Sequence, residues 1–394
     1  MGGDGKLAIG VDFGTSNSAA AVITGGRISY ALADGEPQIP SVVHVAPNGS
    51  LVIGMEALKS AFSDPANTVG SLKRLLGRKP NDPVIRALDR IHAWKLVPGP
   101  DGSVSLELRG KPYAPGQLVA ALLGHLRALG ERRFGSQIGS VVITVPVNVR
   151  REYVIALKRA VAAAGLTTDR VIHEPVAGAI SCGVLDRPKP GKILVADFGG
   201  GTFDCSLIQR GPDGLLPVMT DGDEFLGGDD FDAAFADAIA GVIFRKSRVD
   251  LRRDAVRWGQ LLLRCEAAKR ALSSRHEARV LLRDAYSLGG QFQDIDLLVD
   301  REWLEPHWAP LVERSLFAVQ RLLTSSALQP KQLDEIILIG GTALVPLVKR
   351  SFEGFFGRPA IMSPHANLAV VAGAAMVASG VVQVPQLSAD PSLA

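Results

Sequence analysis

Two acidic, glycine-rich segments of this sequence have the residue types that bind a phosphate group. The first spans Asp12–Ser16 (DFGTS), and the second spans Asp197–Asp204 (DFGGGTFD). Each lies between two apolar runs, a pattern that predicts two strands joined by a tight turn. Glycines let backbone N–H groups approach an anion closely, and the hydroxyls of Thr15, Ser16 and Thr202 add further donors.

An aspartate precedes each of the two turns. Asp12 and Asp197 would face the same anion, which is favourable only if a divalent cation lies between the carboxylates and the phosphate. Two such turns facing each other therefore predict one magnesium-nucleotide in a cleft. A P-loop is excluded, because the sequence has no GxxxxGK[S/T] motif and a strand follows each turn. For either turn alone, an ordinary structural hairpin is the alternative.

The two motifs lie almost half a chain length apart in a sequence of 394 residues. This spacing indicates an internal duplication, and both halves repeat the order strand, turn, proline, helix, at 141–165 and 336–357. Alternating strands and helices predict an α/β fold with mixed sheets flanked by helices. The helices that we expect include 68–77, Pro112–Phe134, Arg151–Gly165, Pro175–Leu185 and a buried one over Leu368–Ala378.

Composition narrows the function classes. The net charge is only +3, from 43 basic and 40 acidic residues, so nucleic-acid binding has little support. No apolar run reaches the roughly 18 residues that a membrane span requires. The three cysteines are scattered and form no CxxC pair, which favours core residues in a reducing, cytoplasmic setting over a metal site.

Further motifs stand in a fixed order with the two hairpins: ITVP at 143–146, HEP at 173–175 and LGGDDFD at 226–232. With them, the sequence resembles the ATPase domain of the DnaK-type heat-shock chaperones over about residues 6–380. The resemblance implies a duplicated actin-like (ribonuclease-H-like) ATPase fold with the nucleotide in a central cleft. It places lobe I at 1–188 with an insert at about 36–115, lobe II at 189–394 with an insert at about 229–308, and a C-terminal helix at about 366–380 that packs back toward the lobe interface.

The resemblance also implies roles for individual residues. Lys73, Glu174, Asp197 and Thr202 would act in catalysis, and Asp12, Asp197 and Asp204 would hold Mg²⁺, partly through water. ATP or ADP would be bound by two groups of residues. Those around the phosphates are Gly14, Thr15, Ser16, Gly199, Gly200, Gly201, Thr202 and Gly228; those around adenosine are Glu266, Lys269, Arg270, Ser273, Gly340, Gly341 and Thr342.

Taken alone, several of these residues also fit ordinary structural roles. Lys73 is typical of a solvated helix lysine, and Glu174 before a proline is typical of a helix start. Glu266, Lys269 and Arg270 follow a helical spacing that also suits an exposed charged face. The surrounding motifs favour the functional interpretation in each case.

Several positions depart from the family pattern. Leu344 stands where the family has an arginine that stacks on adenine, so we expect weaker or less selective base binding. Val154 replaces a family arginine, and His173 and Val176 replace an asparagine and a threonine beside Glu174. The family uses that neighbourhood for J-protein coupling, which these changes disfavour.

The sequence after Val382 has no acidic, leucine-containing linker and no second domain for unfolded peptide. We therefore expect a stand-alone family member without the substrate-binding domain. The favoured function is a slow ATPase that acts as a nucleotide-dependent switch on an unidentified protein partner or client. The alternatives are a non-hydrolysing nucleotide sensor or assembly factor, a small-molecule kinase of the same superfamily, and an actin-like filament former.

Overall fold

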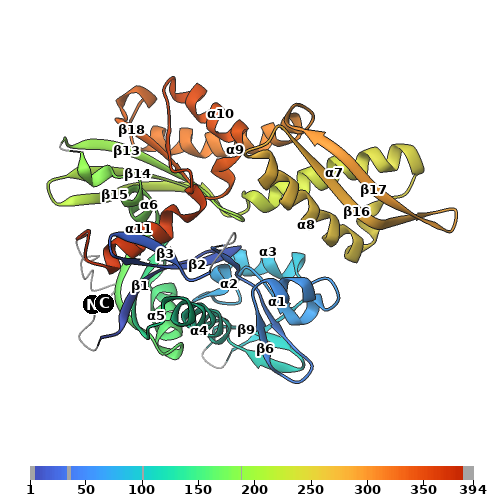
Figure 1. The fold of residues 1–394 in the computed structure, drawn as a ribbon, viewed down its shortest axis with the longest axis horizontal. Coiled ribbons are helices and arrows are strands. Elements are labelled where there is room, and N and C mark those ends of the chain that lie inside the picture. Colours follow the sequence, from blue (N-terminus) through green and yellow to red (C-terminus); the bar gives the residue numbers. More distant parts are fainter. Residues whose placement is uncertain (1–4, 33–36, 100–101, 188, 385–394) are drawn as a thin grey trace.

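The computed structural model describes residues 5–32, 37–99, 102–187 and 189–384. The molecule has two halves, which we call lobe I and lobe II. In Figure 1 lobe I is at the bottom and lobe II at the top, with part of lobe II extending to the right. Both the lobe boundary expected at residue 188 and the chain end after Val384 fall outside the described residues.

The central sheet of lobe I has the strand order β12-β11-β1-β2-β3, and β4 also pairs with β2. β1 runs antiparallel to β2, with the first glycine-rich turn between them, and parallel to β11. The three inner strands of this sheet, β1, β2 and β11, are largely buried, because helices cover the sheet. The bounds are β1 (Leu7–Phe13), β2 (Asn17–Thr24), β3 (Arg27–Tyr30), β4 (Ile39–Pro40), β11 (Ile138–Val145) and β12 (Thr167–His173).

The central sheet of lobe II has the equivalent order β15-β14-β13-β18-β19. β13 runs antiparallel to β14, across the second turn, and parallel to β18, as β1 does with β2 and β11. The expected duplication, and with it the predicted fold class, is confirmed. The bounds are β13 (Gly191–Phe198), β14 (Phe203–Gly211), β15 (Gly214–Asp223), β18 (Glu335–Ile339) and β19 (Ile361–Met362).

The helices of the two lobes occupy equivalent positions relative to the strands. In lobe I, α4 (Pro115–Phe134) precedes β11 and α5 (Arg151–Ala163) joins β11 to β12. In lobe II, α9 (Arg301–Ser325) precedes β18 and α10 (Pro346–Phe356) joins β18 to β19. Prolines at the first turns and left-handed glycines after α4 and α10 set their ends, so these predicted helices are confirmed.

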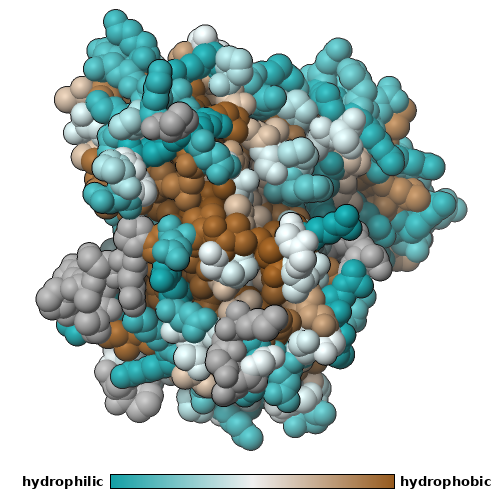
Figure 2. Space-filling view, turned by 60° about the vertical axis from the view of Figure 1, so that its left-hand side comes forward, coloured by the Kyte–Doolittle hydropathy of each residue, from teal (hydrophilic) through white to brown (hydrophobic). Residues whose placement is uncertain are grey.

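The third helix of each half lies against the other half's sheet. α6 (Glu174–Ser181) follows β12 but packs on β13, β14 and β15, whereas α11 (Ala369–Ala378) packs on β1, β2 and β11. The two helices cross closely, because a Cβ at Gly373 would lie 1.9 Å from the carbonyl oxygen of Ala177. Figure 2 shows apolar residues gathered at this waist between the lobes. The exchanged helices join the two lobes.

Each lobe carries an additional region beside its central sheet. Among the described residues, this region contains two three-stranded sheets and three α-helices in lobe I, and two α-helices and a long hairpin in lobe II, at the right of Figure 1. The lobe I elements are β5 (Val43–Val45), β6 (Leu51–Ile53), α1 (Met55–Ser60), β7 (Thr68–Val69), α2 (Leu72–Leu75), α3 (Pro83–Ile91), β8 (Lys95–Pro98), β9 (Val104–Leu108) and β10 (Lys111–Tyr113). Those of lobe II are α7 (Gly228–Ser247), α8 (Ala255–Leu272), β16 (Glu277–Leu288) and β17 (Gln291–Asp300).

The helix expected over 68–77 is wrong over most of its length. Thr68 and Val69, both β-branched, form β7 and pair with β5. The chain then takes a left-handed conformation at Ser71 (φ 53°), so only Leu72–Leu75 is helical. Lys73 therefore lies in a single helical turn held between a strand and a loop.

Replacing Gly373 by alanine tests the close crossing of α6 and α11. We expect Gly373→Ala to lower the free energy of unfolding by about 1–3 kcal/mol, because the new methyl group meets a backbone carbonyl. Gly124→Ala on α4 is the matched control, since a Cβ there has no neighbour within 4 Å. It should leave stability unchanged or raise it. Chemical denaturation measures both, and equal stabilities of the Gly373 variant and the wild type would contradict the crossing.

Candidate functional site

The two glycine-rich turns face each other across the space between the lobes. The Ser16 hydroxyl donates a hydrogen bond to Oδ2 of Asp229, at the start of α7, at 3.0 Å. A Cβ at Gly200 would lie 2.6 Å from Cβ of Ser16, and one at Gly201 would lie 3.4 Å from Cγ2 of Thr15. The two turns therefore face each other, as the sequence predicts.

The second turn is fixed by hydrogen bonds from three directions. Its ends are joined by the Gly199 N–H, which donates to the Thr202 carbonyl at 2.9 Å. The Gly199 carbonyl accepts from the Gly228 N–H at 3.0 Å and from the Thr342 hydroxyl at 2.8 Å. The start of α7 and the loop after β18 thus hold this turn in place.

A cavity of about 310 Å³ lies between the turns. It brings together residues from both lobes and from the two additional regions, which are distant in the sequence. The predicted site residues that line it are Asp12, Gly14, Thr15, Ser16, Lys73, Glu174, Asp197, Gly199, Gly200, Gly201, Thr202, Gly228, Glu266, Lys269, Arg270, Ser273, Gly340, Gly341 and Thr342. Asp204 lines a neighbouring cavity instead.

The acidic residues predicted to hold a metal are held in an environment that disfavours their charge. Burial, reinforced by Glu174, raises the pKa of Asp12 to about 7, against the opposing effects of Lys73 and a hydrogen bond from Thr144. Burial and Glu174 likewise raise the pKa of Asp204 to about 6. The pKa of Asp197 is also raised, by burial first and then by the neighbouring carboxylates. A divalent cation would relieve this repulsion.

These carboxylates could contribute ligands to a cation, but they do not form a complete ligand set by themselves. Across the described ranges, no three His, Cys, Asp or Glu side chains are grouped so that they could hold a metal ion by themselves. Phosphate oxygens and water complete the shell of Mg²⁺ in most nucleotide sites, because the ion is reluctant to lose its water. Ligation by Asp12, Asp197 and Asp204 therefore stays a prediction.

Lys73 and Glu174 form a close ion pair beneath the two turns. The Lys73 ammonium donates to Oε1 of Glu174 at 2.6 Å, and their side chains are only 12% and 9% exposed. Burial alone would lower the pKa of Lys73, but Glu174, Tyr153 and Asp12 outweigh it and raise that pKa above its ordinary value. The ammonium therefore stays charged at the end of the cavity where the turns meet.

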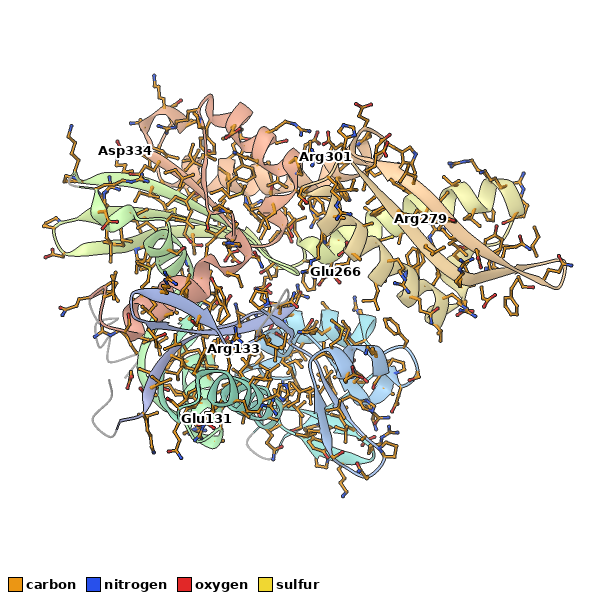
Figure 3. All side chains as sticks on the ribbon, in the orientation of Figure 1. Glu131, Arg133, Glu266, Arg279, Arg301 and Asp334 are labelled. Atoms are coloured by element: carbon orange, nitrogen blue, oxygen red, sulfur yellow. The ribbon has the colours of Figure 1, made fainter. Side chains whose placement is uncertain are left out.

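The residues predicted to contact adenosine come from two places: Glu266, Lys269 and Arg270 on α8 with Ser273 at its end, and Gly340, Gly341 and Thr342 after β18. Glu266, Arg270 and Ser273 line the cavity, and Figure 3 shows Glu266 between the upper and lower halves of the molecule. Lys269 lines it too, but its ammonium donates to Oδ2 of Asp232 at 2.6 Å and to the Gly228 carbonyl at 2.7 Å. Lys269 thus also ties α8 to the start of α7.

The residues that depart from the family pattern lie in the cavity wall, in the core of lobe I, or in a hydrogen bond to the backbone. Leu344 lines the cavity near the adenosine residues. Val154 is buried in the core of lobe I. Nδ1 of His173 lies 3.2 Å from the Pro146 carbonyl, and burial lowers the pKa of this histidine.

Some residues of the site were missed by sequence reasoning. Arg74 reaches across from lobe I and donates to the Gly201 carbonyl at 2.6 Å and to the Glu224 carbonyl, with its guanidinium 4.8 Å from the Phe225 ring centre. Asp229 accepts from Ser16, as described above. Arg74 lies next to Lys73 and Asp229 lies within the LGGDDFD motif, so adjacency to a motif residue was the available signal.

The helices and the cysteines can be compared with what the composition predicts about membrane spans and metal sites. None of the helices in the described ranges has the length and apolar character that crossing a membrane requires. Cys182, Cys205 and Cys265 are all free thiols.

The duplicated sheets, the exchanged third helices and the paired turns around one cavity define the actin-like ATPase fold, a class of nucleotide-binding proteins. A family model described as "Hsp70 protein" matches residues 8–390 of the chain. The chain therefore belongs to the Hsp70 family, whose members are ATP-binding proteins of chaperone type.

Proposed function

We propose that this protein binds ATP with Mg²⁺ between its lobes, hydrolyses it slowly to ADP and phosphate, and acts as a nucleotide-dependent switch on a protein partner. The observation that carries this proposal is the position of the Lys73–Glu174 pair, which lies in the cavity where the two glycine-rich turns face each other. Family membership supports ATP binding independently.

The triphosphate would lie between the turns, with adenosine toward α8. Gly200, Gly201, Thr15, Ser16 and Thr202 line the cavity there, and their backbone N–H groups and hydroxyls would donate to the phosphates. Mg²⁺, when bound, would neutralise phosphate charge and polarise the terminal phosphoryl group. Asp12, Asp197 and Asp204 would orient the shell of the ion.

Hydrolysis would proceed by in-line attack of water on the γ-phosphorus, where positioning and charge neutralisation supply most of the catalysis. The Lys73 ammonium would offset charge on the terminal phosphoryl group. Glu174 would accept a hydrogen bond from the attacking water while it holds Lys73 in place.

The switch would be a change in the angle between the lobes. On the cavity side, Ser16 contacts Asp229 and Arg74 contacts Gly201, so the lobes are linked by contacts that a nucleotide can rearrange. On the other side they are joined by the α6–α11 crossing, which suits a hinge. A protein partner would bind one lobe arrangement more tightly than the other.

We expect the protein to work in the cytoplasm, because its three cysteines are unpaired.

Replacing Lys73 by alanine tests the proposed catalysis. We expect Lys73→Ala to lower the rate of phosphate release at saturating ATP by about 100-fold or more, because one fixed charge is lost at the reacting group. Lys59→Ala is the matched control, since Lys59 is exposed on α1 and forms an ion pair with the exposed Glu56. Equal turnover by the Lys73 variant and the wild type would remove the assigned role, and a wild type without multiple turnover would favour a non-hydrolysing sensor.

Restoring a guanidinium at position 344 tests the proposed place of adenine. We expect Leu344→Arg to tighten ATP binding about two- to tenfold, because a planar cation stacked on an aromatic ring is stabilising. Leu344→Lys adds the same charge without the planar group and should give a smaller gain. Titration calorimetry compares the three proteins. Equal gains for arginine and lysine would point to simple attraction of the phosphates and would contradict the base-stacking position.

A further inference from the structure

A second cavity, of about 420 Å³, opens from the phosphate end of the first. Five residues line both cavities, and none of the adenosine residues on α8 lines the second one. The second cavity therefore lies beyond the terminal phosphate, on the side away from adenosine. The shared residues are Thr15, Lys73, Glu174, Asp197 and Thr202.

Tyr153, in the first turn of α5, lines this second cavity. Its side chain is buried, with 8% of the residue exposed, yet its hydroxyl has no hydrogen-bond partner among the described residues. Buried polar atoms are almost always paired in folded proteins, so this unpaired hydroxyl, on a residue that lines the cavity, is suited to pair with a molecule held there.

The position of Tyr153 relative to Lys73 is fixed by close backbone packing. A Cβ at Gly77 would lie 2.6 Å from the backbone N and 2.7 Å from the Cα of Tyr153, and Gly77 has a φ of +70°. The loop that follows α2 is therefore pressed directly against the start of α5. Since α2 carries Lys73, this contact packs Tyr153 against the segment that carries the lysine.

The charged groups around Tyr153 are those of the proposed reaction centre. Burial raises the pKa of Tyr153; Lys73 opposes this shift, and Glu174 and Asp12 add to it. The phenol therefore keeps its proton over the physiological range. A neutral hydroxyl can accept and donate hydrogen bonds beside a triphosphate without adding negative charge.

We propose that the Tyr153 hydroxyl contacts the water that attacks the terminal phosphate, which makes Tyr153 a further catalytic residue. This inference rests on the ATP hydrolysis proposed above. In-line attack brings water from the side of the γ-phosphorus opposite the departing ADP, which is the side of the second cavity. The phenolic oxygen accepts one water hydrogen and Glu174 accepts the other, so a lone pair of the water points at phosphorus.

The bonds of this step balance without any further reactant. A bond forms between the water oxygen and the γ-phosphorus, while the bond from that phosphorus to the β–γ bridging oxygen breaks. The electron pair of the broken bond stays on the β-phosphate of ADP. The proton released by the water passes to the inorganic phosphate product. Tyr153 positions the water and is unchanged at the end.

Tyr153→Phe removes the hydroxyl and keeps the ring. We expect the single-turnover rate of hydrolysis to fall about 3- to 10-fold, which corresponds to one lost hydrogen bond. We expect the ATP dissociation constant to be unchanged and thermal stability to be equal or higher, because the lost group is unpaired in the fold. Tyr113→Phe, at a half-buried tyrosine of β10, is the matched control and should leave all three quantities unchanged.

The outcomes separate this inference from the proposed function. If the wild type hydrolyses ATP and Tyr153→Phe does so at the same rate, the contact with water is wrong and the ATPase stands. A variant that loses ATP affinity or stability in proportion to its rate also overturns the contact, because the hydroxyl then acts in binding or folding. If the wild type binds ATP and does not hydrolyse it, both proposals fail.

Discussion

An excess of buried acidic groups is the constraint on which the cleft depends. Asp12, Glu174 and Asp197 line the cavity with Lys73, and Asp204 lines the neighbouring cavity. Burial together with repulsion from nearby carboxylates raises the pKa values of the three aspartates. A triphosphate alone would add to the repulsion. A divalent cation together with the triphosphate changes the sign of the interaction, since each carboxylate then faces a positive charge. The acidic cleft is therefore better suited to a metal-nucleotide than to a nucleotide without the metal.

The exchange of third helices determines how the two lobes can meet. α6 lies on the sheet of lobe II and α11 lies on the sheet of lobe I, so each lobe includes a helix from the other half of the chain. Glycine at position 373 permits the close crossing of these helices. The lobes are thus joined firmly on one side, and polar contacts such as Arg74 to the Gly201 carbonyl join them on the other. A ligand between the turns would act on the side that these polar contacts join.

Local pattern was enough to predict the repeated hairpins, because each needs only an apolar run, a glycine turn and a second run. It also predicted α11, whose residues are apolar throughout. The helix predicted around Lys73 was too long, because Thr68 and Val69 pair with β5, a strand about 25 residues earlier in the sequence. The residues predicted between Glu266 and Ser273 do line the cavity, but the partner of Lys269, Asp232, comes from another helix. Contacts between distant elements, including those of Tyr153, need the assembled fold.

The central claim is that the two facing turns hold one nucleotide through a shared magnesium ion. Titration calorimetry of the whole chain with ATP, in the presence of Mg²⁺ and again in EDTA, tests it most directly. The account predicts one ATP per chain and an affinity at least about tenfold weaker without the metal. Absence of binding in Mg²⁺, or equal affinity in EDTA, would contradict it.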